Sequence, residues 1–582
     1  MTTAEVSMGS KPTPSAVSSA KAVVRRSLRR AKRGAGAQLR RRGWQPVTEV
    51  KSAGPVTGLV EEFTRRSVSG WVMVPAGQSG VRVTLHLQDV QVAATWAGDA
   101  VERGGPREIR GFRFALRDVW NFARAEHRLT VRVDGTPLPI AGVGMHVSPE
   151  EDGTRALGTL RKKLETGHVF SRNGRLQLSK SIDEEWQREV LGFYDGLRKV
   201  IKDALGHDLF VMYGSLLGAV REGGFIGHDD DFDAAVIVDA TTGPEAIEAL
   251  KKLAFMLIDA GYDVEGRRSA VHVHHRDDPA IRIDIFHLYF DAQGVLAFAF
   301  GVAGTSDVLK EQWQGVVETR FGPGSVLVPV NGEAMVETIY GAGWRIPTPG
   351  FNWDKDRTKR ERSAIVPLSE VEEIYWANFY ARTEYTSGST FFDFVNARPE
   401  MTQHVIDIGC GDGRDSYAFG LAGRNVTGLD RSHIGVRHAD KKAHDMGMGD
   451  RVQFAACDVA EADNLRGVLN EALGRAGDAA TLFYARFFLH SIPEEVQDTL
   501  MATINEVARP GDLIAAEFRT TADAALMKVH TKHYRRFQDG PAFGVALSEK
   551  YGFEVNYELE SQGLSPYKDE DPVLYRVVAR RR

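Results

Sequence analysis

The sequence predicts a multidomain chain in which a small antiparallel β-sandwich precedes an α+β domain and a C-terminal α/β domain. Three observations carry this prediction. Short alternating apolar runs, separated by Gly, Asp and Pro, fill residues 55–148, which is typical of antiparallel sheets. A segment rich in aspartate follows a glycine turn near residue 230. From about residue 370, apolar strands alternate with helices after a glycine-rich turn, as expected of an α/β sheet.

The composition is that of ordinary globular domains. The chain has 582 residues, of which 43% are hydrophobic and 26% charged, and this length suggests three or four domains. A net charge of −5 argues against a general nucleic-acid binder. The two cysteines, Cys410 and Cys457, provide no disulfide framework and fit a reducing cytosol. Since no secretory h-region and no clean membrane-spanning run is present, we expect a cytoplasmic protein.

Residues 1–50 predict a basic tail that is either disordered or weakly amphipathic. Residues 1–20 are rich in Ser, Thr, Ala and Pro, and residues 21–44 hold ten Lys or Arg and no acid. Such a segment would contact an anionic membrane surface, bind an anionic polymer, or remain a solvated basic face. The first alternative would place the protein at the inner face of the membrane.

The β-sandwich of residues 55–148 is expected to be an accessory module. Its runs, such as GWVMV and VRVTLHL, alternate apolar and polar residues, which puts one face of each strand in a core. Trp71, Trp96 and Phe112 would either stack on sugars or pack in that core, and core packing is the favoured role. A glycan-binding role for the module stays open.

The segment FVMYGSLLGAVREGGFIGHDDDFDAAVIV, residues 210–238, organises the next domain. Its aspartates crowd into five residues: Asp229, Asp230, Asp231 and Asp233. Carboxylates this close repel each other unless a cation neutralises them. Asp231 and Asp233 alternate along a predicted strand and so point to one face, and Asp284 would add a third oxygen donor from the apolar run IRIDIFHLYF. We therefore predict a Mg²⁺ or Mn²⁺ site at these three acids rather than a solvated turn.

Four motifs contain or flank these acids. They are YGSLLGAVR (213–221), GFI (224–226), DDDFD (229–233) and YGAGWRIP (340–347). Over about residues 180–360 they resemble the LicD/fukutin family of the polymerase beta-like nucleotidyltransferase superfamily. The family usually has Trp where His228 stands, a departure that would alter the substrate pocket. The resemblance implies an α+β nucleotidyltransferase-like domain over residues 150–365 that transfers a phospho-alcohol from a CDP-alcohol to a glycan.

The resemblance also implies roles for single residues. Metal ions would be held by Asp231, Asp233 and Asp284. Gly214 and Ser215 would bind the nucleotide phosphates, and Arg221 would neutralise charge on the transferring phosphate. Two alternatives stay open: a nucleotidyltransferase that makes an activated phospho-alcohol or sugar, and a non-catalytic glycan-binding unit. A zinc site at the nearby run His272, His274 and His275 is disfavoured, because no cysteine or second histidine cluster accompanies it.

The C-terminal domain, residues 370–582, begins with a strand, a glycine turn and a helix in HVIDIGCGDGRDSYAF. The glycines let the backbone approach a ligand closely, and Asp430 ends the second strand, where a carboxylate takes ribose hydroxyls. A dinucleotide-binding fold prefers the spacing GxGxxG. The segment DIGCGDG (407–413) instead resembles the first motif of class I S-adenosylmethionine-dependent methyltransferases, which implies an α/β Rossmann-like fold and S-adenosylmethionine as cofactor.

From this resemblance we expect the cofactor to be bound by Asp407, Gly409, Gly411, Gly413, Asp430, Asp458, Val459 and Arg486. Asp430 would bind ribose, and Asp458 and Val459 would lie near adenine. His490 would act as the general base for the acceptor. Tyr375 and Tyr380 would cover the cofactor from a preceding helix.

The fusion of the two units suggests a bifunctional enzyme that modifies cell-surface glycans. The first unit would add a phospho-alcohol, and the second would methylate the glycan or its phospho-substituent. The expected partners are a CDP-alcohol donor, a cell-surface or lipid-linked glycan acceptor, and no nucleic acid. O-methylation and N-methylation both stay open.

Overall fold

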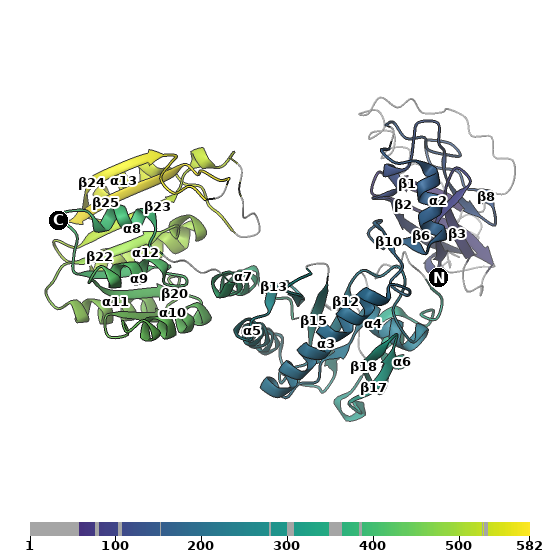
Figure 1. Ribbon diagram of the computed structural model, residues 1–582, viewed down its shortest axis with the longest axis horizontal. Coiled ribbons are helices and arrows are strands. Elements are labelled where there is room, and N and C mark those ends of the chain that lie inside the picture. The colour runs from purple at the N-terminus through teal and green to yellow at the C-terminus, as the bar shows by residue number, and fades with distance from the viewer. Residues whose placement is uncertain are drawn as a thin grey trace, which may run out of the picture. The chain divides into compact units, whose positions relative to one another are not determined.

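The computed structural model describes residues 58–75, 81–102, 107–151, 153–278, 281–298, 308–347, 364–382, 387–526, 528, 534–567 and 569–582. The predicted basic tail, residues 1–50, and its membrane contact lie outside these residues. Contacts divide the chain into two compact units, residues 1–246 with 280–364 and residues 247–279 with 365–582. None of the helices in the described ranges is long and apolar enough to cross a membrane. Figure 1 labels the elements of each unit.

The first unit begins with eight strands that form two four-stranded antiparallel sheets, ordered β1-β2-β6-β5 and β4-β3-β7-β8. The strands are β1 (Gly58–Phe63), β2 (Ser67–Pro75), β3 (Val81–Leu87), β4 (Val90–Ala97), β5 (Asp99–Glu102), β6 (Arg107–Ala115), β7 (Leu129–Val133) and β8 (Thr136–Pro137). Alternate residues of both sheets, such as Val72, Phe114 and Val83, meet in one hydrophobic core. We call these eight strands and the loops that join them the β-module.

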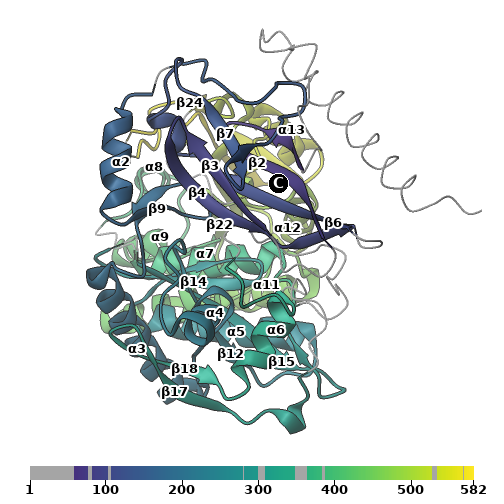
Figure 2. The ribbon, with the colours of Figure 1, turned by 90° about the vertical axis from the view of Figure 1, so that its right-hand side faces the viewer.

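A helix and a hairpin pack on the β-module, and Figure 2 shows both at its side. They are α2 (Leu157–Glu165), β9 (His168–Phe170) and β10 (Leu176–Leu178). Leu160 of α2 is fully buried in the module's core, and Phe170 and Leu176 pack against the same core. Strands β9 and β10 pair antiparallel.

The rest of the first unit contains α3 (Glu184–Leu205), β11 (Phe210–Val211), α4 (Tyr213–Leu217), a π-helical turn (Gly218–Glu222), β12 (Phe232–Ile237), β15 (Arg282–Phe290), β16 (Leu296–Ala297), β17 (Val316–Phe321), β18 (Gly324–Pro329) and α6 (Gly332–Tyr340). Helix α3 buries a stripe at helical spacing that includes Val190, Tyr194 and Leu197. Strands β12 and β15 are parallel neighbours, while β11 pairs antiparallel with β12. This arrangement places the start of β12 beside the start of β15.

The second unit includes a segment from the middle of the chain. It contains α5 (Gly243–Asp259, from residue 247 onward), β13 (Asp263–Gly266), β14 (Ala270–His274) and α7 (Leu368–Arg382). Strands β13 and β14 form an antiparallel hairpin. The side chain of Asn378 on α7 accepts a hydrogen bond from the Val264 amide at 3.0 Å. Residues 247–279 of the predicted domain 150–365 thus group with the C-terminal unit.

The C-terminal sheet has seven strands in the order β21-β20-β19-β22-β23-β25-β24. Its elements are α8 (Thr390–Asn396), β19 (His404–Ile408), α9 (Arg414–Leu421), β20 (Asn425–Asp430), α10 (His433–Asp445), β21 (Val452–Ala456), α11 (Ala462–Ala476), β22 (Thr481–Arg486), α12 (Glu494–Val507), β23 (Leu513–Arg519), α13 (Gly540–Glu549), β24 (Phe553–Ser561) and β25 (Leu574–Arg581). Strand β25 runs antiparallel to β23 and β24, so the sheet is mixed.

Each face of this sheet has its own core. Val405 of β19 packs with residues of α8, α9 and α10, whereas Ile406 packs with residues of α11, α12 and α13, because successive side chains of a strand point to opposite faces. The strand order reverses between β19 and β22, and a crevice for ligands forms at the carboxyl ends of strands at such a point. The predicted multidomain organisation with a C-terminal α/β fold is confirmed.

A buried histidine predicts a pH dependence of stability in the first unit. His287 on β15 is fully buried, its Nε2 lies 3.0 Å from the Ala364 carbonyl oxygen, and burial lowers its pKa from 6.5 to about 4. The unfolded chain therefore binds a proton near pH 6.5 that the folded chain does not. The His287 contribution to the free energy of unfolding is complete above that pH and falls by about 2 kcal/mol between pH 7.5 and 5.

Denaturant unfolding of the wild type, H287Q and the control H207Q at both pH values measures this effect. Between pH 7.5 and pH 5, the free energy of unfolding of H207Q should fall as much as that of the wild type. The fall in H287Q should be smaller by about 2 kcal/mol. Equal pH dependence in all three proteins would contradict the prediction.

Candidate functional site

The acids predicted to bind metal come together at the starts of two strands. Asp233 on β12 and Asp284 on β15 are direct neighbours in the parallel register, and Asp231 immediately precedes β12. One carboxylate oxygen from each of the three lies within 4.8 Å of the others. Asp229 and Asp230 form a further group with Asp231 at the same spacing. We call these five aspartates the acid site.

Burial gives the acid site unusual electrostatics. Asp233 and Asp284 are buried, and burial, followed by the charge of Asp231, raises the pKa of Asp233 well above its ordinary value. The same causes raise the pKa of Asp229. Oδ1 of Asp231 is buried without a hydrogen-bond partner among the described residues. An all-carboxylate donor set with a buried, unpaired oxygen fits a hard divalent cation such as Mg²⁺ or Mn²⁺.

Two arginines that the sequence reasoning missed reach the acid site. Arg282 holds Asp284 in a bidentate pair, with Nε at 2.6 Å and Nη2 at 3.1 Å from the two carboxylate oxygens. Nη2 of Arg172, in the turn between β9 and β10, lies 3.3 Å from Oδ2 of Asp231. Arg282 precedes Asp284 by two residues and so shares its strand face, a signal that the sequence contains. Arg172 comes from another part of the chain and has no such signal.

The predicted nucleotide-binding residues also brace the acid site. The Gly214 amide donates to Oδ2 of Asp233 at 3.0 Å, and Oγ of Ser215 accepts from the Asp233 amide at 2.9 Å. A Cβ on Gly214 would collide with the Asp229 carboxylate. Tyr213, just before them, has a positive φ of 45°, a strained conformation that is frequent at functional sites. Binding of phosphates by Gly214 and Ser215 stays a prediction.

Arg221 lies near His228 rather than in a described ion pair with the acids. Its Nε pairs with Glu222 at 2.7 Å, and its Nη1 donates to the Trp344 carbonyl at 3.2 Å, which joins the motif of residues 340–347 to that of residues 213–221. Burial, and then the charge of Arg221, lower the pKa of His228 to about 4. The predicted phosphate-neutralising role of Arg221 stays a prediction.

The histidine run of the second unit includes a group with metal-ligand spacing. Glu265, His272 and His274 place one donor atom each within 4.8 Å of one another. Glu265 lies opposite His272 in the hairpin register, which the sequence pattern alone does not reveal. Arg267 already pairs with Glu265 at 2.9 Å and contacts Nδ1 of His272 at 3.4 Å, so a guanidinium balances the charge of this group.

The glycine turn after β19 has the geometry of a ligand-binding loop. Gly409, Gly411 and Gly413 have φ values of 72°, 57° and 81°, and residues that carry a side chain rarely adopt such values. A Cβ on Gly411 would lie 2.5 Å from the ring of Tyr380, so this ring of α7 covers the turn. The Gly411 amide donates to Oδ2 of Asp430 at 3.0 Å.

Asp430 is oriented from both sides, because the Ser432 amide donates to its other oxygen at 2.8 Å. Asp407 on β19 is buried, accepts from Oγ of Ser416 at 2.6 Å, and has a pKa raised by burial to about 7. At the end of β21, Asp458 is partly exposed and Val459 is buried. The predicted cofactor residues Asp407, Gly409, Gly411, Gly413 and Asp430 therefore lie on one β19–β20 edge, with Asp458 and Val459 after the adjacent strand.

Arg486 and His490 lie among buried polar groups. Nε of Arg486 is 3.6 Å from Glu517 and 3.9 Å from Asp415. His490 is buried, and its Nδ1 accepts from the Arg519 amide at 3.4 Å. These contacts give both residues a structural task, and their predicted roles in cofactor binding and base catalysis stay predictions.

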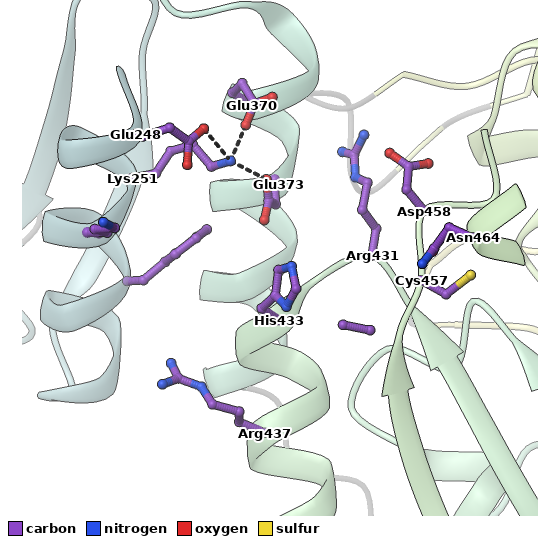
Figure 3. A pocket seen from close by; sticks show the side chains of 13 residues that line it. Glu248, Lys251, Glu370, Glu373, Arg431, His433, Arg437, Cys457, Asp458 and Asn464 are labelled. Atoms are coloured by element: carbon purple, nitrogen blue, oxygen red, sulfur yellow. Dashed lines mark hydrogen bonds and ion pairs between the residues drawn. The ribbon is translucent and has the colours of Figure 1, made fainter. Parts of the chain in front are cut away.

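A cavity of about 670 Å³ opens within the second unit and is lined by Arg431 and Asp458, among others (Figure 3). Its lining comes from α5, α7, the loop after β20, α10, the end of β21 with the loop after it, and α11. Lys251 pairs there with Glu248 at 3.3 Å and Glu373 at 3.0 Å, and Asp458 lies on the opposite wall. The cavity is thus mixed in charge, and Asp458, which is predicted to lie near the adenine, is part of its lining.

Comparison with family models gives two matches. Residues 206–329 match the model described as "LicD/FKTN/FKRP, nucleotidyltransferase domain", and residues 405–511 match a "Methyltransferase domain". The chain therefore contains both domains, and the predicted fusion is confirmed. The second match supports S-adenosylmethionine as a cofactor. A search of curated proteins finds no match.

Three solved structures illustrate what this chain is similar to. The glycopeptide N-methyltransferase MtfA is 16% identical and covers 34% of this chain and 97% of its own, with a TM-score of 0.27. An S-adenosylmethionine-dependent methyltransferase from Anabaena variabilis is 15% identical and covers 37% and 96%, with a TM-score of 0.29. TehB from Haemophilus influenzae is 13% identical and covers 36% and 67%, with a TM-score of 0.27.

Proposed function

We propose that this chain, in which a LicD-type domain precedes a methyltransferase domain, is a bifunctional glycan-modifying enzyme. Its first domain would transfer a phospho-alcohol from a CDP-alcohol to a glycan, and its second would methylate the glycan or the new substituent. The observation that carries the first activity is the convergence of Asp231, Asp233 and Asp284, whose oxygens lie within 4.8 Å of one another on paired strands.

In the proposed transfer, a hydroxyl oxygen of the glycan attacks the phosphorus that bears the alcohol. The bond from this phosphorus to the oxygen shared with the second phosphate breaks, and CMP leaves with that oxygen. The hydroxyl proton passes to a carboxylate of the acid site; Asp229, which lies beside Asp231 in the second group of acids, is the candidate general base. A divalent cation held by Asp231, Asp233 and Asp284 would supply positive charge to the phosphates.

Residues around the acids keep this arrangement fixed. Gly214 and Ser215 hold Asp233 by hydrogen bonds, and Arg282 holds Asp284. Preorganised charges of this kind need no rearrangement during the reaction. Gly214 and Ser215 are proposed to contribute to nucleotide binding as well, and Arg221 to balance phosphate charge.

For the second domain, we propose that Asp430 binds the ribose of S-adenosylmethionine, that Asp458 and Val459 border its adenine, and that the turn at Gly409, Gly411 and Gly413 borders its methionine part. The sulfonium already activates the methyl group, so the protein mainly supplies alignment. His490 as base and Arg486 as a cofactor contact belong to this proposal. The acceptor would be assembled on a lipid at the cytosolic face of the membrane, where the basic residues 21–44 would bind.

A second candidate for the first domain is nucleotidyl transfer, because the matched family model is described as a nucleotidyltransferase domain. The same three acids would serve it. The two reactions differ in their products, since phospho-alcohol transfer releases CMP and nucleotidyl transfer from a nucleoside triphosphate releases pyrophosphate.

The test is CMP release from CDP-choline, CDP-ribitol, CDP-glycerol and CDP-ethanolamine with Mg²⁺ or Mn²⁺ and extracted lipid-linked glycan. We expect metal-dependent CMP release by the wild type and none by D231A. Pyrophosphate release from CTP and a phospho-alcohol would favour the second candidate. Binding of the glycan without either product would contradict catalysis by the first domain. Transfer of radiolabelled methyl groups to the same glycan tests the second domain.

A further inference from the structure

Arg172 lies at the entrance of the acid site. Its Nη2 contacts Oδ2 of Asp231 at 3.3 Å, and 51% of its side chain is exposed, compared with 7% of the Asp231 side chain. A guanidinium stays protonated at physiological pH, so Arg172 is a cation. A guanidinium is a planar fork of donors that matches the oxygens of a phosphate. Arg172 therefore contacts a buried carboxylate while half of its side chain remains exposed to solvent.

The β-module fixes the hairpin that carries Arg172. The Asp118 amide donates to the Gly174 carbonyl at 2.8 Å, and Oδ2 of Asp118 accepts from the Leu176 amide at 3.0 Å. Gly174 has a φ of 74°, and a Cβ there would lie 2.5 Å from the Arg117 backbone nitrogen. Phe170 and Leu176 pack on the module's hydrophobic core. The turn at residues 171–175 is therefore docked on β-module backbone.

The same hairpin contacts the loop that carries the acids. Nε2 of Gln177 donates to the Asp229 carbonyl at 3.2 Å, and the Lys180 amide donates to the Gly227 carbonyl at 2.9 Å. Strands β9 and β10 therefore connect the β-module to the acid site, with Arg172 at the point of contact. This position lies outside the family match of residues 206–329.

We propose that Arg172 binds a phosphate of the nucleotide donor at the acid site, and that the β-module serves to hold the hairpin that presents it. The inference rests on the proposed phosphotransfer. A divalent cation at the three acids competes with Arg172 for the charge of Asp231. The guanidinium is then available to the phosphates that arrive with the donor, so the arginine exchanges a carboxylate partner for a phosphate partner at the same place.

The first measurement is Mn²⁺ binding to the full-length protein by calorimetry without nucleotide. R172A should bind Mn²⁺ about threefold to tenfold more tightly than the wild type, because a competing cation is gone. R175A is the matched control, since Arg175 is an exposed arginine of the same turn; it should bind Mn²⁺ as the wild type does. R172K keeps the charge and should lie near the wild type.

The second measurement is binding of CDP in saturating Mn²⁺. R172A should bind CDP about tenfold to a hundredfold more weakly, R172K should lose part of this affinity because it lacks the fork, and R175A should not change. Opposite shifts for metal and nucleotide in R172A support the proposal. Tighter Mn²⁺ binding with unchanged CDP binding would make Arg172 a counter-ion only and overturn it.

The third variant, G174A, tests the support from the β-module, because it perturbs the docked turn and keeps the arginine side chain itself. We expect CDP affinity to fall as in R172A while thermal melting shows a folded chain. CDP binding like the wild type in G174A would overturn the supporting role. If the wild type itself binds no CDP with Mn²⁺, the proposed function fails and the inference with it; if it binds and R172A matches it, only the inference fails.

Discussion

Replacing Asp233 with asparagine is expected to lower phosphotransfer by at least about a thousandfold and to remove measurable Mn²⁺ binding. Asparagine keeps the size of the side chain and an oxygen that can accept from the Gly214 amide, which donates to Asp233 at 3.0 Å. It removes one of three carboxylate charges whose oxygens lie within 4.8 Å. The expected loss therefore comes from charge and metal coordination rather than from packing.

D239N is the matched control for this variant, since Asp239 follows the same strand and is exposed. CMP release and Mn²⁺ calorimetry on the wild type, D233N and D239N measure the effect, and D239N should behave as the wild type does. Metal-dependent CMP release by D233N at a rate within tenfold of the wild type would exclude Asp233 from the metal site.

Replacing Asp430 with asparagine is expected to weaken S-adenosylmethionine binding by about a hundredfold and to reduce methyl transfer at limiting cofactor accordingly. Backbone amides of Gly411 and Ser432 hold the two carboxylate oxygens at 3.0 and 2.8 Å. An amide side chain would offer an NH₂ group to one of these donors, which disturbs the turn, and it would lose the charge that strengthens hydrogen bonds to ribose hydroxyls.

Calorimetric titration of S-adenosylmethionine into the wild type, D430N and D445N measures this change. Asp445 is exposed at the end of α10, and D445N should bind like the wild type. Since the acid site lies in the other unit, Mn²⁺ binding should be the same in all three proteins. Unchanged cofactor affinity in D430N would show that the ribose is held elsewhere.

Much of both sites could be predicted from short-range sequence pattern. Residues two apart on a strand share a face, which grouped Asp231 with Asp233, and an acid inside an apolar run pointed to Asp284. The structure adds the parallel pairing of β12 with β15 that makes Asp233 and Asp284 neighbours. Glycine spacing likewise pointed to the turn that now has positive φ angles at Gly409 and Gly411.

Tertiary contacts explain what the pattern could not supply. Arg172 contacts Asp231 from a hairpin that docks on the β-module, and nothing in its own sequence neighbours indicates this. Arg486 was expected to bind the cofactor, yet its Nε lies 3.6 Å from Glu517 and 3.9 Å from Asp415, and these two residues come from two other elements. The sequence pattern can place a residue on a strand, but it does not identify the charged side chains that contact the residue in the folded protein.

The docking of the hairpin on the β-module also bears on how such genes can be rearranged. A recombination event that joined the family-matched segment, residues 206–329, to a different upstream partner would keep the aspartates but not Arg172 or the Asp118 and Gly174 contacts that position it. Under the proposed role of Arg172, the segment needed for the first activity is longer than the family match and includes the β-module, so these segments are expected to be transmitted together.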